Sequence, residues 1–564
     1  MRIRIFIPAL CLFAVASLGA AAMAVPAAPA TDSVLAAKID AVLAEVYKPG
    51  EPGAAVIVRK DGRTVFRKGY GMANLELGVP VEPGMVFRLG SITKQFTSVS
   101  ILLLAQDGKL GLQDEVTKFL PDYPTQGRRI TVEHLLTHTS GIQSYTEMPE
   151  WLPLWRKDFT VPELIDVFKD KPMQFEPGRD WAYNNSGYIL LGAIIEKVAG
   201  KSYEAFVEER IFRPLGMRSS FYDITERIIP RRIPGYHEGK DGFINAPYLS
   251  MTQPYAAGSL LSTVDDLALW SDAVFSGKLI DKKWLDKAFT PYKLQNGESS
   301  GYGYGWFVAD FAGHRSIEHG GGINGFSTYE MTFPEDSLFL AILTNGAIEG
   351  RAPEPRAVKI AWLALGLAEP ERKVISVPAG DLDALAGVYV NERKQEYYFR
   401  REGNKLIAQR QGGAKNEIYP ASSMEFFLKD NPARFAFVKD PGGHVTGLKV
   451  KSRIGPVQIF TRTDRPLPEP RKQAAIDPKL YDRLAGDYEL APNFIITILR
   501  RGDRLISLAT GQPEVELFPE SETRFFLKEV DAQVDFLLDG AGKVTGLVLH
   551  QGGQDLPARK IRRT

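Results

Sequence analysis

The sequence predicts a mixed α/β (α+β) domain followed by two copies of an all-β module. Three observations lead to this prediction. The chain has 564 residues, more than one hydrophobic core usually supports. Strand and helix signals are mixed over residues 31–368, whereas short alternating runs and turn residues fill the remainder. With 44% hydrophobic and 24% charged residues, the composition is typical of folded protein.

The first domain, residues 31–368, is expected to contain an antiparallel sheet that is split in sequence around a mostly helical insertion. Strands are predicted at 54–58, 64–68, 316–318, 327–333 and 338–344, the first two forming a hairpin around Asp61-Gly62. Helices are predicted at 91–107, 186–199 and 264–275, each ending before a glycine, and at 356–365. We expect the helices to flank the sheet.

The two modules, residues 379–464 and 478–564, are copies of one another. Matching segments are offset by 99 residues: Leu385-Ala386-Gly387 with Leu484-Ala485-Gly486, Phe426-Phe427-Leu428-Lys429 with Phe525-Phe526-Leu527-Lys528, and Val445-Thr446-Gly447-Leu448 with Val544-Thr545-Gly546-Leu547. An offset this long indicates a duplicated domain, because solenoid repeats are shorter. Hairpin signals in both copies predict small closed barrels, joined by the proline-rich stretch 465–470.

The N-terminus has the pattern of a secretory signal peptide. Arg2 and Arg4 precede an apolar run over residues 5–22, and Ala22-Met23-Ala24 matches a cleavage site after residue 24. We therefore expect residues 1–24 to be removed from an exported bacterial protein, periplasmic or secreted. The alternative is an uncleaved anchor, because the run is near bilayer-spanning length, and membrane attachment is expected only then.

Composition excludes several classes of function. Cys11, the only cysteine, lies in the predicted signal peptide, so disulfides, thiolate zinc sites and cysteine catalysis are excluded from the mature chain. The net charge of +1 gives no electrostatic footprint for nucleic acid. The seven histidines include no H-E-x-x-H pair, and we expect no metal site. The expected partner is a small-molecule or peptide substrate, and the oligomeric state stays open.

The first chemical motif is Ser91-Ile92-Thr93-Lys94, at the start of a predicted helix. This spacing places the serine and the lysine on one helix face, one turn apart. A serine hydroxyl needs a base to become a nucleophile, and a lysine can serve if burial lowers its pKa. Because four residues of this kind also arise by chance, an ordinary surface helix start is the alternative.

The second motif is Tyr183-Asn184-Asn185, ahead of a predicted helix. Tyr183 could act as a phenolate or relay a proton, and the Asn185 amide could hold a substrate carbonyl and orient Lys94. The alternative is a buried aromatic residue beside a helix N-cap. Tyr389-Val390-Asn391 fits the same pattern, but its counterpart in the second module is Tyr488-Glu489-Leu490, so we interpret Tyr389 as structural.

The third motif is His319-Gly320-Gly321-Gly322, followed by strand-like sequence. Glycines let a substrate approach a strand edge, and backbone N–H groups there can face a developing oxyanion. His237 and His550 also fit H-x-G. They lack the glycine run and the following strand, and we interpret both as surface histidines.

Taken in order, the three motifs resemble the active-site motifs of the class C β-lactamase and penicillin-binding-protein superfamily. Phe87-Arg88-Leu89-Gly90, residues 134–141 and Ala256-Ala257-Gly258-Ser259 add to the resemblance, which spans about residues 35–368. It implies a β-lactamase/transpeptidase-like fold and needs no cofactor. The implied roles are Ser91 as nucleophile, Lys94 and Tyr183 in proton transfer, Asn185, His319, Gly320 and Gly321 in substrate binding, and the N–H groups of Ser91 and Gly322 as oxyanion hole.

The third motif departs from the Lys-Thr-Gly of true β-lactamases and resembles the esterase and D-aminopeptidase branch. A histidine near its ordinary pKa is mostly neutral at pH 7, so we expect weak hydrolysis of carboxylate-bearing antibiotics. The prediction is a peptidase or esterase acting on D-amino-acid or cell-wall-type substrates. The alternatives are a true β-lactamase, a D,D-carboxypeptidase, or a β-lactam or muropeptide sensor without turnover.

The modules outside the resemblance carry no catalytic pattern. We expect the catalytic core to be complete at Ala368, and the modules to bound access to the Ser91 cleft, as loops beside an active site often do. The alternative is that they add mass or bind cell-wall partners.

Overall fold

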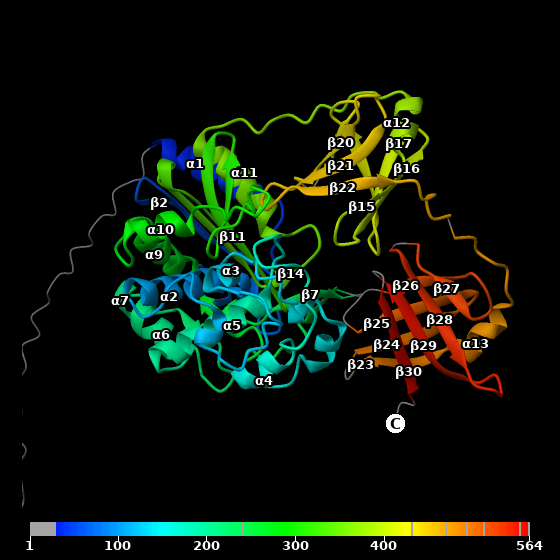
Figure 1. Ribbon diagram of the computed structural model, residues 1–564, viewed down its shortest axis with the longest axis horizontal. Coiled ribbons are helices and arrows are strands. Elements are labelled where there is room, and N and C mark those ends of the chain that lie inside the picture. The colour runs from blue at the N-terminus through cyan, green and yellow to red at the C-terminus, as the bar shows by residue number, and fades with distance from the viewer. Residues whose placement is uncertain are drawn as a thin grey trace, which may run out of the picture.

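The computed structural model describes residues 30–239, 242–429, 432–469, 471–491, 494–510, 514–528, 530–551 and 554–561. The predicted signal peptide, residues 1–24, lies outside these ranges. A mixed domain is followed by two closed barrels, which lie on one flank of it (Figure 1). This confirms the predicted fold class. In the described ranges, no helix is long and apolar enough to cross a membrane.

The mixed domain is built on a six-stranded antiparallel sheet in the order β10-β11-β12-β13-β1-β2. The strands are β1 (Ala54–Lys60), β2 (Arg63–Tyr70), β10 (Phe307–Phe311), β11 (His314–Ile323), β12 (Phe326–Phe333) and β13 (Leu338–Thr344). β1 pairs directly with β13, which joins the N-terminal hairpin to strands from the end of the domain. The sheet is therefore split in sequence as predicted.

Both faces of this sheet are covered, and the sequence of β1 shows why. Val56 and Val58 belong to the apolar cluster beneath α1 (Ala30–Ala44) and α11 (Pro353–Leu365), whereas Ile57 belongs to the cluster on the opposite face. Successive strand residues point to opposite faces, so a strand buried on both sides has to be apolar throughout.

The helical insertion covers the second face. Its helices are α2 (Thr93–Gln106), α3 (Val132–Leu136), α4 (Val161–Asp166), α5 (Asn185–Ala199), α6 (Tyr203–Val207), α7 (Arg213–Leu215), α8 (Tyr255–Gly258), α9 (Val264–Phe275) and α10 (Lys282–Ala288). Every residue of α2 from Thr93 to Ala105 is buried. A helix buried on all sides lies at the centre of its domain, and α2 therefore gives the first motif a fixed position.

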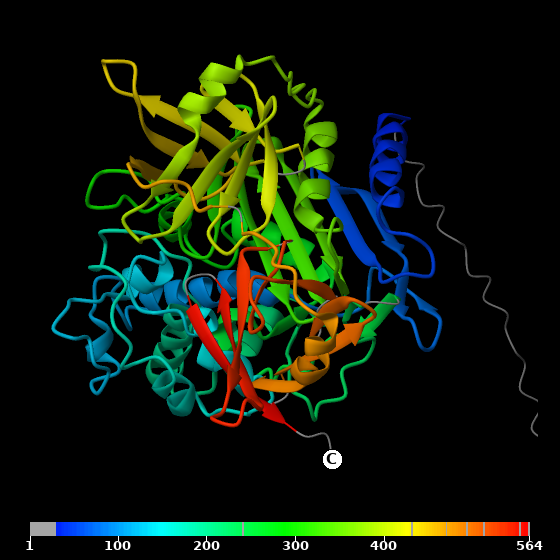
Figure 2. The ribbon, with the colours of Figure 1, turned by 90° about the vertical axis from the view of Figure 1, so that its right-hand side faces the viewer.

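The two barrels each contain eight antiparallel strands. Barrel 1 contains β15 (Gly387–Val390), β16 (Glu396–Glu402), β17 (Lys405–Arg410), β18 (Lys415–Pro420), β19 (Glu425–Phe427), β20 (Arg434–Lys439), β21 (Val445–Lys451) and β22 (Gln458–Thr463). Barrel 2 contains β23 (Gly486–Ala491), β24 (Phe494–Arg501), β25 (Arg504–Ala509), β26 (Val515–Pro519), β27 (Arg524–Phe526), β28 (Ala532–Leu538), β29 (Val544–Gln551) and β30 (Gln554–Ile561). Figure 2 shows both barrels facing the viewer, barrel 1 above barrel 2.

Equivalent residues of the two copies make the same contact. Tyr389 Oη donates a hydrogen bond to the carbonyl oxygen of Leu385 at 2.8 Å, and Tyr488 Oη donates one to the carbonyl oxygen of Leu484. Both tyrosines are fully buried in their barrel cores. Tyr389 is thus a structural residue, as interpreted from the sequence.

Candidate active site

Ser91 lies in a short 3-10 turn, η1 (Gly90–Ile92), that continues into α2. Lys94 follows one helical turn later, and its Nζ lies 3.1 Å from Ser91 Oγ. The same nitrogen donates to Asn185 Oδ1 at 2.8 Å and to the carbonyl oxygen of Ala257 at 2.9 Å. The first motif is therefore one hydrogen-bonded pair, fixed by contacts from α5 and α8.

Lys94 is completely buried. Its Nζ lies 4.8 Å from the ring centre of Tyr183 and 5.4 Å from that of Tyr188. Among the described residues, no carboxylate forms an ion pair with it. Burial lowers the pKa of Lys94 well below its ordinary value of 10.5, which favours the neutral amine. A neutral amine beside the serine hydroxyl can accept its proton.

Tyr183 is partly buried, and its hydroxyl is buried near this pair. Burial raises the pKa of the Tyr183 hydroxyl, and the adjacent Ser91 hydroxyl opposes this effect only in part. The side chain is therefore a phenol near neutral pH. Of the two possibilities raised by the sequence, the phenol favours proton relay over a phenolate base.

The two asparagines of the second motif have different contacts. Asn184 is the N-cap of α5, and its Oδ1 accepts the N–H of Gly187 at 2.8 Å. Asn185 is the first helical residue; besides accepting from Lys94, it donates through Nδ2 to Thr146 Oγ1 at 2.9 Å. The helix N-cap, which was the alternative for this motif, is Asn184, and the contact with Lys94 is made by its neighbour Asn185.

His319 on β11 is 2% exposed. Its Nδ1 lies 2.6 Å from the carbonyl oxygen of Gly320, and its Nε2 lies 3.0 Å from Tyr302 Oη. Because a carbonyl only accepts, Nδ1 carries the hydrogen and Nε2 accepts from the tyrosine. Burial, with a smaller effect of nearby Lys94, lowers the pKa of His319 to about 3. The expectation that this pKa is near its ordinary value is wrong, because the ring is desolvated.

The glycines of the third motif let β11 pack against the loop before Ser91. Gly90 has a φ of +56°, and a β-carbon there would lie 3.0 Å from the nitrogen of Gly322. A β-carbon at Gly321 would lie 1.9 Å from the carbonyl oxygen of Leu89. Only glycine permits this approach. It brings the backbone of Ser91 and Gly322 together, as an oxyanion hole requires.

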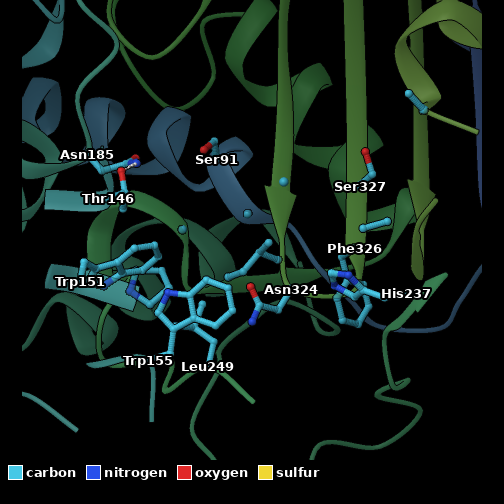
Figure 3. A pocket seen from close by; sticks show the side chains of 18 of the residues that line it. Ser91, Thr146, Trp151, Trp155, Asn185, His237, Leu249, Asn324, Phe326 and Ser327 are labelled. Atoms are coloured by element: carbon cyan, nitrogen blue, oxygen red, sulfur yellow. Dashed lines mark hydrogen bonds between the residues drawn. The ribbon is translucent and has the colours of Figure 1, made fainter. Parts of the chain in front are cut away.

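A cavity of about 590 Å³ opens at Ser91. Its apolar wall is formed by Tyr145, Trp151, Trp155, Leu249, Ile323 and Phe326. Figure 3 shows Ser91 and Asn185 toward one end, with Trp151, Trp155 and Leu249 toward the other. Among its described lining residues, none is a lysine or arginine and Glu349 is the only carboxylate. The cavity therefore suits an apolar group that is neutral or carries an amine.

The structure brings the predicted residues together to different degrees. Ser91, Asn185 and Gly322 line the cavity, Lys94 is buried next to Ser91, and the buried hydroxyl of Tyr183 lies nearby. His319, Gly320 and Gly321 are not among its described lining residues, and their role in substrate binding remains a prediction.

One further expectation needs correction. His237, on β7 (Tyr236–Gly239), is not a simple surface histidine, because it lines the cavity and its Nε2 accepts the N–H of Gly325 at 2.9 Å. All described lining residues of the cavity lie between Gly90 and Ala352, and the expectation that the modules bound access to the cleft stays a prediction.

Several site residues were not predicted. Trp151 and Trp155 lie in the long insertion and belong to no motif, and Tyr302 precedes its partner His319 by 17 residues. Their only signal is aromatic character in a turn-rich segment, which is common in ordinary cores. In the part of the chain that the structure describes, no group of three or more His, Cys, Asp or Glu side chains could hold a metal ion.

Comparison with known proteins finds two matching sequence families. The sequence family described as Beta-lactamase matches residues 35–362, and a family described as Domain of unknown function (DUF3471) matches residues 470–560. The chain is 26% identical to Penicillin-binding protein 4* of Bacillus subtilis, over 90% of this chain and 94% of that protein.

Solved structures of similar fold include the following two. The octameric penicillin-binding protein homologue from Pyrococcus abyssi is 28% identical with a TM-score of 0.54, covering 76% of this chain and 99% of that one. The D-amino acid amidase from Ochrobactrum anthropi SV3, complexed with L-phenylalanine amide, is 25% identical with a TM-score of 0.52, covering 60% of this chain and 99% of that one.

Proposed function

The chain belongs to the beta-lactamase family of serine hydrolases, and we propose that it hydrolyses amide or ester bonds of D-amino-acid or cell-wall-type substrates through an acyl-enzyme on Ser91. The observation that carries this proposal is the contact of 3.1 Å between Ser91 Oγ and the buried Nζ of Lys94. Export of the protein, which the N-terminal sequence pattern predicts, is part of the proposal.

The reaction takes place in two steps. Ser91 Oγ attacks the substrate carbonyl carbon while the neutral amine of Lys94 accepts the hydroxyl proton. The N–H groups of Ser91 and Gly322 stabilise the oxyanion. The proton passes through the Tyr183 phenol to the leaving amine or alcohol, which departs as the carbonyl bond re-forms. Water then attacks the acyl-enzyme and releases the acid and the free serine.

The lining of the cavity favours a neutral or amine-bearing substrate over an anionic one. Its described lining offers aromatic and aliphatic surface and one carboxylate, Glu349, with no lysine or arginine to pair with a substrate carboxylate. Burying an unpaired carboxylate is costly, which disfavours β-lactams and peptides with a free C-terminus. The likeness to a D-amino acid amidase supports the amide of an apolar D-amino acid as substrate.

A panel of four substrates tests this proposal: p-nitrophenyl butyrate, D-phenylalanine p-nitroanilide, nitrocefin, and a peptide ending in D-alanyl-D-alanine. We expect turnover of the ester and the anilide, with kcat/KM at least roughly tenfold above that for nitrocefin, the scale of one lost charge contact. Glu349→Gln should lower kcat/KM for the cationic anilide severalfold and leave the neutral ester unchanged. Exposed Glu335→Gln is the matched control.

Each other outcome selects an alternative. Preference for nitrocefin would indicate a true β-lactamase, and release of D-alanine a D,D-carboxypeptidase. Labelling by fluorescent penicillin without release of product from any substrate would indicate a sensor.

A further inference from the structure

Arg453 extends from barrel 1 to the strand that carries the third motif. It lies in the connection between β21 and β22, which points toward the catalytic domain (Figure 1). Its Nη1 donates to Glu318 Oε1 at 2.6 Å, and its Nη2 donates to Glu354 Oε1 at 2.9 Å. The Arg453 side chain is 12% exposed and the Glu318 side chain is 0% exposed. This is a buried ion pair across a domain boundary.

Glu318 immediately precedes His319 on β11, and its hydrogen-bond partners lie beside the third motif. Glu318 Oε1 also accepts from Ser316 Oγ at 2.8 Å, and Oε2 accepts from Tyr329 Oη at 2.7 Å. The Tyr329 ring packs over Gly320, where a β-carbon would lie 2.9 Å from it. Gly321, on the opposite face, meets the loop before Ser91. The strand is therefore held between this network and the nucleophile loop.

We propose that Arg453 is a positioning residue for the Ser91 reaction, cancelling the negative charge of Glu318 and holding the strand that supplies the Gly322 N–H. The inference rests on the proposed acyl-enzyme function and assigns barrel 1 a part in it. This proposal departs from the expectation that the catalytic core is complete at Ala368, because the cation that pairs with Glu318 comes from residue 453.

The size of the effect follows from distance. Gly322 lies four residue positions after Glu318 on the strand, a span of about 13 Å. At that distance and an effective dielectric constant of about 20, an uncompensated carboxylate opposes an oxyanion enough to slow the reaction roughly tenfold. The charge acts on the transition state more than on a neutral bound substrate, so kcat should fall while KM changes little.

Removing one partner of a buried pair differs from removing both. Without Arg453, the carboxylates of Glu318 and Glu354 would face each other with no cation between them. Replacing both members of such a pair with neutral groups is often tolerated, whereas leaving one charge unpaired is not. Neutralising Glu318 should therefore rescue a variant that lacks Arg453.

A second arginine of barrel 1 provides an internal comparison. Arg393 Nε donates to Asp180 Oδ2 at 2.8 Å, three residues before Tyr183. Both side chains are about one third exposed, at 33% and 37%. Exposed pairs contribute little, so Arg393→Met should have a much smaller effect than Arg453→Met.

The experiment compares Arg453→Met, Glu318→Gln, the double variant and Arg453→Lys in the full chain. Arg401→Met is the matched control, because Arg401 pairs with Asp383 inside barrel 1. The measurements are kcat and KM for p-nitrophenyl butyrate, the rate of Ser91 labelling by a fluorophosphonate, and circular dichroism. We expect a roughly tenfold lower kcat in Arg453→Met with KM within about twofold, recovery in the double variant, and an intermediate Arg453→Lys.

Equal kcat in Arg453→Met and Arg401→Met, or a folded double variant that is as slow as Arg453→Met, would overturn the proposal. If Arg453→Met fails to fold, the double variant decides. A folded double variant with normal kcat supports charge cancellation, and a folded double variant with low kcat contradicts it. A double variant that also fails to fold would show that Arg453 is a structural residue and would overturn the proposal. Failure of the hydrolase function is distinguishable: the wild type would then be labelled at Ser91 but release no product, and labelling rates alone would still test Arg453.

Discussion

Lys94 Nζ lies 3.1 Å from Ser91 Oγ and has two further oxygen partners, Asn185 Oδ1 and the carbonyl oxygen of Ala257. A lysine ammonium has three hydrogens and can donate to all three oxygens. A neutral amine has two hydrogens and can donate to only two of them. Because the site is desolvated, the amine form is available at a pH where an exposed lysine would be charged. In the proposed mechanism, this arrangement gives Ser91 a base without a histidine and a carboxylate.

Lys94→Ala and Tyr183→Phe should each lower the rate of acylation by roughly 10²–10⁴-fold, the usual effect of losing general acid–base help. In the wild type, kcat/KM should rise with pH as Lys94 loses its proton, at a pH well below 10.5. Tyr183→Phe should keep this rising limb and Lys94→Ala should lose it. A pH profile of stopped-flow acylation measures both. Unchanged acylation in both variants would contradict the assignment of Lys94 and Tyr183 to proton transfer and would leave the proton acceptor of Ser91 unidentified.

His319→Lys should destabilise the protein. True β-lactamases carry a lysine in the third motif, but here the His319 ring is buried against Tyr302. An ammonium in this position would be desolvated and close to Lys94, which should cost about 3 kcal/mol or more. Thermal unfolding measures the loss, with His319→Gln as the neutral control. An unchanged Tm together with a selective gain on nitrocefin would show that residue 319 faces the substrate.

Glu330→Gln should stabilise the protein at alkaline pH. Glu330 lies opposite His319 on β12, and burial raises its pKa from 4.5 to about 7, while the Gln95 hydrogen bond opposes this. Between these two values the unfolded chain loses the proton first, so stability falls as pH rises. Above pH 7 the loss is complete, at about 3 kcal/mol. Below pH 4.5 both states are protonated and the group contributes nothing.

Urea unfolding at pH 5 and pH 8.5 checks this sign. The variant should gain about 3 kcal/mol over the wild type at pH 8.5 and slightly less than about 1 kcal/mol at pH 5. Exposed Glu335→Gln is the control and should show no such difference. An equal effect of Glu330→Gln at the two pH values would mean that Glu330 keeps an ordinary titration in the fold.

Much of the fold and the central pair could be predicted from the sequence. The spacing of Ser91 and Lys94 needed only a helix to bring both to one face, and glycine after each helical run marked helix ends correctly. The offset of 99 residues predicted two equivalent barrels, and the shared contact of Tyr389 and Tyr488 shows that equivalence in atoms. These signals are local or repetitive, so a single sequence contains them.

Other features depend on contacts between distant segments. Arg453 and Glu318 are 135 residues apart, and an arginine in a barrel turn reads as a solvated charge until the domain packing is known. The burial of His319 depends on the Tyr302 hydroxyl and on the rings around it. The apolar cavity is formed by Trp151 and Trp155, from a segment that has no motif. Tertiary packing decides all three.

Intact-protein and peptide mass spectrometry after incubation with a fluorophosphonate is the most direct test of Ser91 as the nucleophile. The wild type should gain one label on the peptide that contains Ser91, and Ser91→Ala, checked for folding by circular dichroism, should gain none. A label that appears in Ser91→Ala at the wild-type rate, or that maps to another peptide in the wild type, would contradict the account.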